Sequence, residues 1–323
     1  MATQETVAQP RTFADLFGAI SSNIQAVIQG KREVIDLVLL CLVSEGHLLI
    51  EDVPGVGKTS LAKALARSVD CSFGRVQFTP DLLPSDVVGV TVWNRNDGKF
   101  EFRPGPIFAG IVLGDEINRA SPKTQSALLE AMAEGQVTVD GTTHPLPDPF
   151  LVVATQNPLS GDLGTFPLVG GQRDRFSVSL SMGLPGRAAE LDVLAGRGGD
   201  HALEHLAPTA DPGTWLRLRR EVDDVYLHPV VATYALDLVD SIRAHTGSNQ
   251  PLSTRAALAL VRLARANALA DGRAYVAPDD VQAVAVAALA HRIIDVTNDD
   301  LVAARAWVTS ILTRVPVPPR LDP

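Results

Sequence analysis

The chain has 323 residues, of which 46% are hydrophobic, and it carries a formal net charge of −9 with a pI near 5.2. This much apolar sequence excludes a disordered chain, and the length suits two domains. The acidic balance disfavours a dedicated nucleic-acid binder, which usually carries a basic patch. Cys41 and Cys71 are too few and too far apart for a disulfide framework or a zinc site, so we expect reduced thiols.

No segment of the sequence predicts insertion into a membrane or export. Residues 1–10 lack the cationic and apolar regions of a signal peptide. The most apolar run, Leu37 to Val43, is far shorter than the roughly 20 residues that a membrane span needs. We therefore expect a cytoplasmic protein with no membrane span.

Short apolar runs alternate with helical stretches in the first two thirds of the chain. This alternation favours a parallel sheet that is covered by helices on both faces. We predict helices at 12–29, 32–44, 58–69, 121–134 and 186–196 and strands at 47–51, 75–79, 110–114, 150–155 and 176–181. The polar residues that carry chemistry should then gather at the carboxyl ends of the strands.

Two stretches interrupt this rhythm, and each is typical of an inserted β-hairpin. Residues 84–108 hold two extended segments around a turn at Asn94–Gly98, and residues 136–148 turn at Gly141. From about residue 205 the strand signals give way to helical periodicity. Helices are predicted at 213–225, 229–245, 254–270, 278–290 and 298–313, before an extended tail from Val315. The predicted fold class is α/β, with a parallel-sheet core at 1–204 and a smaller all-helical domain at 205–323.

A glycine turn between an apolar strand and a helix occupies residues 51–60, Glu-Asp-Val-Pro-Gly-Val-Gly-Lys-Thr-Ser. Gly55 and Gly57 let backbone N–H groups converge on phosphate oxygens, and the helix dipole attracts the same anion. Lys58 would reach the β- and γ-phosphates, and the Thr59 hydroxyl would hold Mg²⁺. Asp52 stands where the phosphate-loop pattern has glycine. The alternative is an ordinary Gly/Pro turn that happens to precede Lys-Thr.

Acidic and amide side chains follow the next two buried strands. Asp115 and Glu116 end the run Ile111-Val-Leu-Gly, and one carboxylate could serve the metal while the other orients the attacking water. Asn157 ends the run Leu151-Val-Val-Ala-Thr-Gln and could reach the γ-phosphate or that water. The competing interpretations are a solvated acidic turn and an Asn-Pro turn starter.

Two arginines complete the candidate set, although each taken singly is typical of a surface side chain. Arg175 lies in Asp174-Arg-Phe176, and Arg255 follows Ser253-Thr at the first turn of a helix. The ordered set Pro-Gly-Val-Gly-Lys-Thr, Asp-Glu-Ile-Asn-Arg, Ala-Thr-Gln-Asn-Pro and Asp-Arg-Phe resembles the AAA+ ATPases, and specifically the MoxR group. Further stretches similar to that group lie at 78–86, 115–130, 164–168, 279–281 and 291–292, so the resemblance covers roughly residues 12–315.

The resemblance implies a P-loop AAA+ core followed by a helical lid, and a role for each motif. The ATP-binding Walker A residues are then Pro54, Gly55, Val56, Gly57, Lys58, Thr59 and Ser60. Asp115 matches the Walker B aspartate, which shares Mg²⁺ with Thr59, and Glu116 matches the base that activates water. The hairpins at 84–108 and 136–148 look like the helix-2 insert and the pre-sensor-1 hairpin, which face a pore or a partner.

The remaining roles also follow from the resemblance. Asn157 matches sensor 1, and Arg255 matches sensor 2. Arg175 matches the arginine finger, which reaches into the neighbouring subunit's site, although Arg173 could take that role instead. The chain departs from the family at Gly135, where arginine is usual, and at Gly170-Gly171, which replaces Glu-Ala before the finger.

The function implied by the resemblance is ATP hydrolysis by a ring, expected to be a hexamer. Such rings are chaperone-like and remodel or activate client proteins, for instance von Willebrand factor A domain proteins in metal insertion. The alternatives are the ATPase subunit of a metal chelatase and a nucleotide-gated assembly scaffold with little turnover. A DNA-acting motor is disfavoured by the acidic charge, so no nucleic-acid partner is expected.

Overall fold

The computed structural model describes residues 12–157, 165–196, 198–246, 252–294 and 300–319. The predictions made for residues 1–10, for 298–299 at the start of the last helix, and for the end of the tail lie outside these ranges. Within the described residues, no helix is long and apolar enough to cross a membrane.

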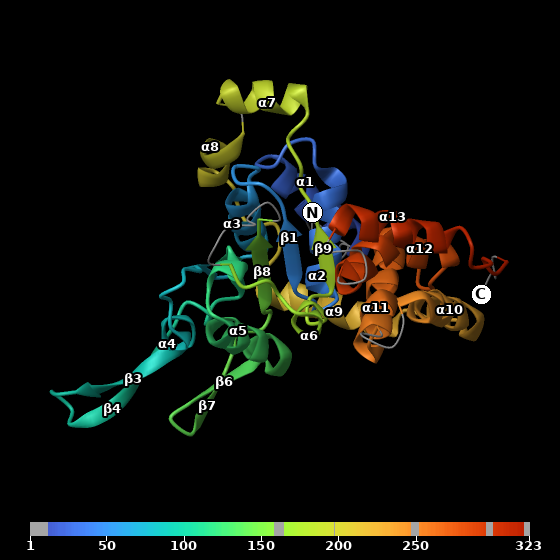
Figure 1. Cartoon of the computed structure of the whole chain (residues 1–323). Helices are drawn as coiled ribbons and strands as arrows, with labels where there is room; N and C mark the ends of the chain where they lie inside the picture. Colours follow the sequence, from blue (N-terminus) through green and yellow to red (C-terminus); the bar gives the residue numbers. More distant parts are fainter. Residues whose placement is uncertain (1–11, 158–164, 197, 247–251, 295–299, 320–323) are drawn as a thin grey trace, which may run out of the picture.

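A five-stranded parallel sheet forms the centre of the first domain, as predicted. Its strands lie in the order β2-β5-β8-β1-β9. Figure 1 labels β8, β1 and β9 side by side in this sheet. They are β1 (Leu48–Glu51), β2 (Phe73–Gln77), β5 (Ile111–Asp115), β8 (Leu151–Gln156) and β9 (Val178–Leu180). The largest deviation from the predicted bounds is at β2, which begins and ends two residues before the predicted 75–79. The register places Gln77 directly opposite Asp115 at the carboxyl edge.

Helices cover both faces of this sheet, because successive strand residues point to opposite sides. Leu48 and Ile50 belong to the apolar cluster that contains residues of α1 (Phe13–Gln25), α2 (Arg32–Val43) and α3 (Lys58–Ser68). Leu49 belongs to the cluster on the other face, with α5 (Pro122–Glu134). The helix bounds agree with the predicted ones, except that α1 ends four residues early.

The two predicted hairpins are present and project from the side of the sheet that α5 covers (Figure 1). The first consists of β3 (Gly89–Asn94) and β4 (Lys99–Pro104), and the second of β6 (Gln136–Val139) and β7 (Thr142–Pro145). A short helix that the sequence did not predict, α4 (Pro84–Val88), precedes β3. Gly89 has φ +99°, and a Cβ there would lie 2.4 Å from the Arg103 carbonyl oxygen, so the first hairpin requires glycine at its base.

The C-terminal part of the described chain is helical, as predicted, apart from an isolated bridge between Tyr226 and Tyr275. Its helices are α9 (Pro212–Asp224), α10 (Pro229–Thr246), α11 (Thr254–Ala270), α12 (Pro278–Leu289) and α13 (Leu301–Leu312). We call this helical part the lid. Between β9 and the lid lie two short helices, α7 (Arg187–Leu194) and α8 (Gly199–Glu204). Lid residues such as Val284 share the apolar cluster of α1 and α2, so the lid packs directly on the core.

Candidate functional site

The loop between β1 and α3 has the backbone geometry of a phosphate-binding turn. Gly55 and Gly57 adopt φ +85° and +94°, a region that side chains rarely tolerate. Gly57 is also the N-cap of α3, so the first N–H groups of that helix point out of its open end. A Cβ built on Gly55 would meet nothing within 4 Å, which leaves room for a ligand to approach the backbone. This geometry suits an anion at the helix start.

A cavity of about 350 Å³ lies in front of this loop, at the carboxyl ends of β1, β2, β5 and β8. Its lining residues are Pro54, Gly55, Gly57, Lys58, Thr59, Ser60, Gln77, Asp115, Glu116, Thr155 and Asn157. The cavity thus brings together most of the residues that the sequence proposed for the phosphate loop, the acidic pair and sensor 1. The exception within the loop is Val56, which is buried and does not line the cavity.

The Lys58 ammonium lies against the loop that it follows. Its Nζ donates to the Asp52 carbonyl oxygen at 2.8 Å and to the Val53 carbonyl oxygen at 3.2 Å. Burial lowers the pKa of Lys58, while the negative charges of Asp52, Asp115 and Glu116 oppose that change. A cation in this position faces the acids across the cavity and can neutralise phosphate oxygens placed between them.

Asp52, which breaks the glycine pattern of the phosphate loop, anchors that loop. Its buried carboxylate accepts hydrogen bonds from Gly183 N at 2.7 Å, Ser181 Oγ at 2.9 Å and Val53 N at 2.9 Å. Burial alone would raise the pKa of Asp52, but these hydrogen bonds outweigh it and lower the pKa. The side chain is therefore ionised at neutral pH, and it ties the start of the loop to the segment that follows β9.

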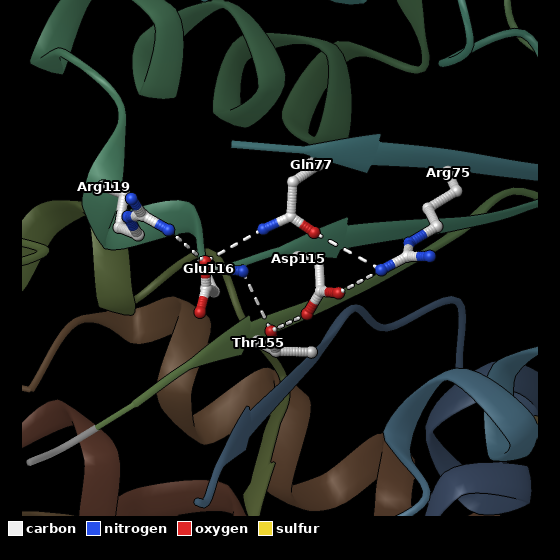
Figure 2. A network of polar contacts seen from close by, with 6 residues as sticks. All are labelled: Arg75, Gln77, Asp115, Glu116, Arg119 and Thr155. Atoms are coloured by element: carbon white, nitrogen blue, oxygen red, sulfur yellow. Dashed lines mark hydrogen bonds and ion pairs between the residues drawn. The ribbon is translucent and has the colours of Figure 1, made fainter. Parts of the chain in front are cut away.

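The Asp115 carboxylate is fixed from two sides (Figure 2). Thr155 Oγ1 donates to Asp115 Oδ1 at 2.7 Å, and Arg75 Nη2 donates to Asp115 Oδ2 at 2.8 Å. Thr155 Oγ1 in turn accepts from the Glu116 backbone N at 3.0 Å. One hydroxyl on β8 thereby connects both acids of the pair.

Glu116 occupies a strained position directly after β5, and its carboxylate has two partners (Figure 2). Its φ of +57° is uncommon for a residue with a side chain and often marks functional sites. Its Oε2 accepts from Gln77 Nε2 at 2.9 Å and from Arg119 Nη1 at 2.8 Å. The Glu116 carboxylate is thus held in a fixed position at the edge of the cavity.

Gln77 and Thr155 line the cavity but were missed by the sequence reasoning. Thr155 ends the predicted strand 150–155, so a search for polar residues at the carboxyl ends of the predicted strands would have found it. Gln77 ends β2 but lies inside the predicted strand 75–79, so its place at the cavity follows only from the fold.

The three candidate arginines lie elsewhere in the subunit. Arg175 Nη1 donates to the Leu129 carbonyl oxygen of α5 at 3.1 Å, and Arg173 is buried in α6 (Gly170–Arg173). Arg255 is exposed on the first turn of α11. Within the ranges that the structure describes, none of the three lines the cavity.

The departures from the family pattern have local explanations in the backbone. Gly170 and Gly171 form the first turn of α6 rather than an open loop. Gly135 ends α5 with φ +62°, where glycine costs least. None of these three glycines lines the cavity.

Comparisons with known proteins agree with this architecture. Residues 47–178 match the ATPase family associated with various cellular activities (AAA), and residues 241–310 match the AAA lid domain. The uncharacterized protein YeaC of Bacillus subtilis is 47% identical over 305 residues, which cover 94% of this chain and 95% of YeaC. Chaperone MoxR1 of Mycobacterium tuberculosis is 36% identical over 312 residues, which cover 92% of this chain and 81% of that protein.

A solved structure shows the same arrangement of core and lid. The crystal structure of a candidate ATPase from Cytophaga hutchinsonii superposes with a TM-score of 0.83 at 35% sequence identity. The match covers 95% of this chain and 96% of that one.

Proposed function

Since this chain belongs to the MoxR family of AAA+ ATPases and is an ATP hydrolase, we propose that it works as a ring in which each active site is completed by a neighbouring subunit. One observation carries this proposal. The phosphate loop, the acidic pair and Asn157 line a single cavity, whereas Arg175 and Arg255 of the same chain do not. We infer that a neighbouring subunit supplies the arginines that the site lacks within its own chain.

In the proposed site, the loop backbone and Lys58 bind the phosphates of ATP. Thr59 and Asp115 would hold Mg²⁺, since both line the cavity and offer the oxygen ligands that this ion prefers. When bound, Mg²⁺ neutralises charge on the β- and γ-phosphates. Glu116 takes the proton of the attacking water, and Asn157 donates a hydrogen bond to the γ-phosphate or to that water. These parts act by position and charge and need no covalent intermediate.

The arginines are assigned to the neighbouring site. Arg175 is proposed as the finger, with Arg173 as the alternative, and Arg255 as a second arginine that also acts in trans, because it is exposed on its own subunit. An arginine supplied in this way raises turnover by roughly 10³–10⁵ in other NTPases. We expect a hexamer in which assembly switches hydrolysis on.

The proposed output of the ring is chaperone-like remodelling or activation of a client protein. Two features support it: one relative is named a chaperone, and the β3–β4 hairpin exposes Trp93 and Phe100 at 53% and 72%. The proposed clients carry a von Willebrand factor A domain, with metal insertion as one setting. The two alternative functions are the ATPase subunit of a metal chelatase and a nucleotide-gated assembly scaffold with little turnover. We also propose a core at 1–204, a lid at 205–323 and a cytoplasmic location, which the free thiols of Cys41 and Cys71 suit.

The experiment that tests this function measures Mg-ATP turnover per subunit across protein concentration, with particle size measured on the same samples. Turnover that rises as rings form supports shared active sites. Constant turnover per subunit from monomer to ring would contradict them, and nucleotide-driven assembly without turnover would favour the scaffold. Lys58→Ala is the negative control, because it removes the cation at the phosphates.

A further inference from the structure

The segment that carries the candidate finger is fastened to the lid of its own subunit. Arg292 of the lid donates from Nε to Asp174 Oδ1 at 3.0 Å and from Nη2 to the Asp174 carbonyl oxygen at 3.2 Å. The same Nη2 also donates to the Phe176 carbonyl oxygen at 2.8 Å. One guanidinium therefore holds the backbone on both sides of Arg175.

Two further lid residues contact the same segment. His291 Nε2 lies 2.9 Å from the Phe176 carbonyl oxygen, and Ser253 Oγ donates to Asp174 Oδ2 at 2.7 Å. Ser253 is the N-cap of α11, two positions before Arg255. The Asp174 carboxylate thus joins the 3₁₀ turn 290–292 after α12, through Arg292, to the start of α11, through Ser253.

The ion pair between Arg292 and Asp174 is largely buried. The Arg292 side chain is 3% exposed and that of Asp174 is 18% exposed. Burial lowers the pKa of Arg292, and the charge and hydrogen bonds of Asp174 oppose that change. Removing one member of such a pair leaves an uncompensated charge and is strongly destabilising. The segment cannot easily leave the lid while the subunit stays folded.

We propose that Arg292 and Ser253 are positioning residues that couple the finger segment 173–176 to the lid, so that lid movement in one subunit repositions the arginine offered to the next. The inference rests on the proposed function, since it requires a finger that acts in trans. Arg175 lies between Asp174 and Phe176, which Arg292 holds. Arg255 lies two positions after Ser253, which holds Asp174. Both arginines should therefore move together with the lid. A change in the lid then reaches the neighbouring site without any change in that site's own cavity.

Arg292→Lys tests the coupling, because lysine keeps the charge but cannot make the forked contact. We expect rings that form and bind Mg-ADP as the wild type does, with KM for ATP within about twofold and kcat lowered by about 10²-fold, the size expected for a misplaced catalytic group. Ser253→Ala removes a single hydrogen bond and should lower kcat in the same direction by a smaller factor, which keeps the test usable if Arg292→Lys does not fold.

A mixing experiment gives the direction of the effect. Arg292→Lys subunits should be defective as finger donors but competent as nucleotide sites. Mixed rings with Lys58→Ala subunits, which keep an intact finger segment, should therefore recover hydrolysis. Mixed rings with Arg175→Ala subunits should not recover, because both partners then offer a defective finger. A general folding defect would not produce this asymmetry.

The matched control is Arg273→Lys, which alters a comparable fork within the lid, where Arg273 contacts the buried Asp280 at 2.6 Å. It should leave kcat within about twofold, since it does not contact the finger segment. If Arg175→Ala and Lys58→Ala subunits complement each other but Arg292→Lys and Lys58→Ala do not, the coupling is wrong and the proposed function stands. If Arg175→Ala and Lys58→Ala fail to complement in mixed rings, the finger in trans is wrong and the coupling fails with it.

Discussion

The phosphate cavity and the finger segment differ in what surrounds them. Around the cavity, strand ends of one sheet bring polar groups together, and each acid is already held by neighbours from the same core, such as Thr155 and Gln77. The finger segment contacts the core through Arg175 and Leu129, but it is also tied to the lid through Arg292 and Ser253. In the proposed mechanism, the half of the machinery that binds phosphate is therefore separate from the half that supplies the arginines.

If the proposed function holds, this difference lets one fold keep nucleotide binding constant while hydrolysis responds to assembly. The cavity half depends on a rigid parallel sheet, whose apolar strands are buried on both faces. The arginine half depends on the position of a separate helical layer. Variants that damage only one half should therefore show different kinetic signatures.

The largest effect is expected from Arg175→Ala. It should lower kcat by roughly 10³–10⁵ and leave ATP binding intact, because the residue does not line the cavity of its own chain. Steady-state turnover together with binding of a fluorescent nucleotide measures both quantities. Arg173→Ala and Arg255→Ala, compared in parallel, show which arginine carries the larger share. If Arg175→Ala lowered the affinity for nucleotide as much as it lowered kcat, binding and hydrolysis would not depend on separate parts of the molecule.

Next comes Glu116→Gln, which removes the proposed base but keeps the shape of the side chain. Turnover should fall by about 10²–10⁴ while ATP binds at least as tightly as before. Glu130→Gln, on the exposed face of α5, is the control that changes the same charge without touching the cavity. Unchanged turnover in Glu116→Gln would remove this residue from the mechanism.

Asp52→Ala should destabilise the cavity half by about 3 kcal/mol, because it leaves Gly183 N and Ser181 Oγ without their charged acceptor. ATP affinity should fall with stability, since the loop loses its anchor. Urea unfolding and nucleotide titration measure the two effects, with the exposed Asp237→Ala as the control. Wild-type stability in Asp52→Ala would mean that the loop holds its shape without the carboxylate.

The smallest effect concerns pH and the buried His47, which donates to the Met132 carbonyl oxygen and accepts from Val152 N. Burial lowers the pKa of His47 to about 4 from its ordinary value of 6.5. The unfolded chain therefore binds more protons between these values, so stability is lost as pH falls through this window. The loss from this group between pH 8 and pH 5 should be about 2 kcal/mol.

His47→Gln should remove that part of the acid sensitivity, and the exposed His201→Gln should not. Urea unfolding of the three proteins at pH 8 and pH 5 makes the comparison. An equal acid sensitivity in wild type and His47→Gln would show that other groups dominate this window.

The sequence predicted the fold well wherever one local signal determined the outcome. Apolar runs located the five strands, and the glycine turn located the loop before α3. Gln77 was missed because its role depends on strand order, which places β2 beside β5 and Gln77 opposite Asp115. The end of β2 at Gln77 and the start of β5 at Ile111 are 34 residues apart in the sequence (77 to 111). Neither segment alone indicates that the two strands pair in this register.

Asp52 and the arginines show a second limit. Asp52 counted as a flaw in the phosphate-loop pattern, because its partners Ser181 and Gly183 lie far away in the chain and become neighbours only on folding. The functional roles of Arg175 and Arg255 depend on a second subunit, so they stay predictions. Local patterns specify strands and turns, whereas contacts between distant segments require the folded chain.

The Thr155 hydroxyl gives the acidic pair a property that neither acid has alone. Its single proton is directed at Asp115, and its lone pair accepts the backbone N–H of Glu116. Because the hydroxyl uses its one proton for Asp115 and a lone pair for the Glu116 N–H, it fixes the Asp115 carboxylate relative to the peptide bond that sets the direction of Glu116. Serine could preserve both hydrogen bonds, but valine, which matches threonine in shape, would remove them and leave the orientations of the two acids independent.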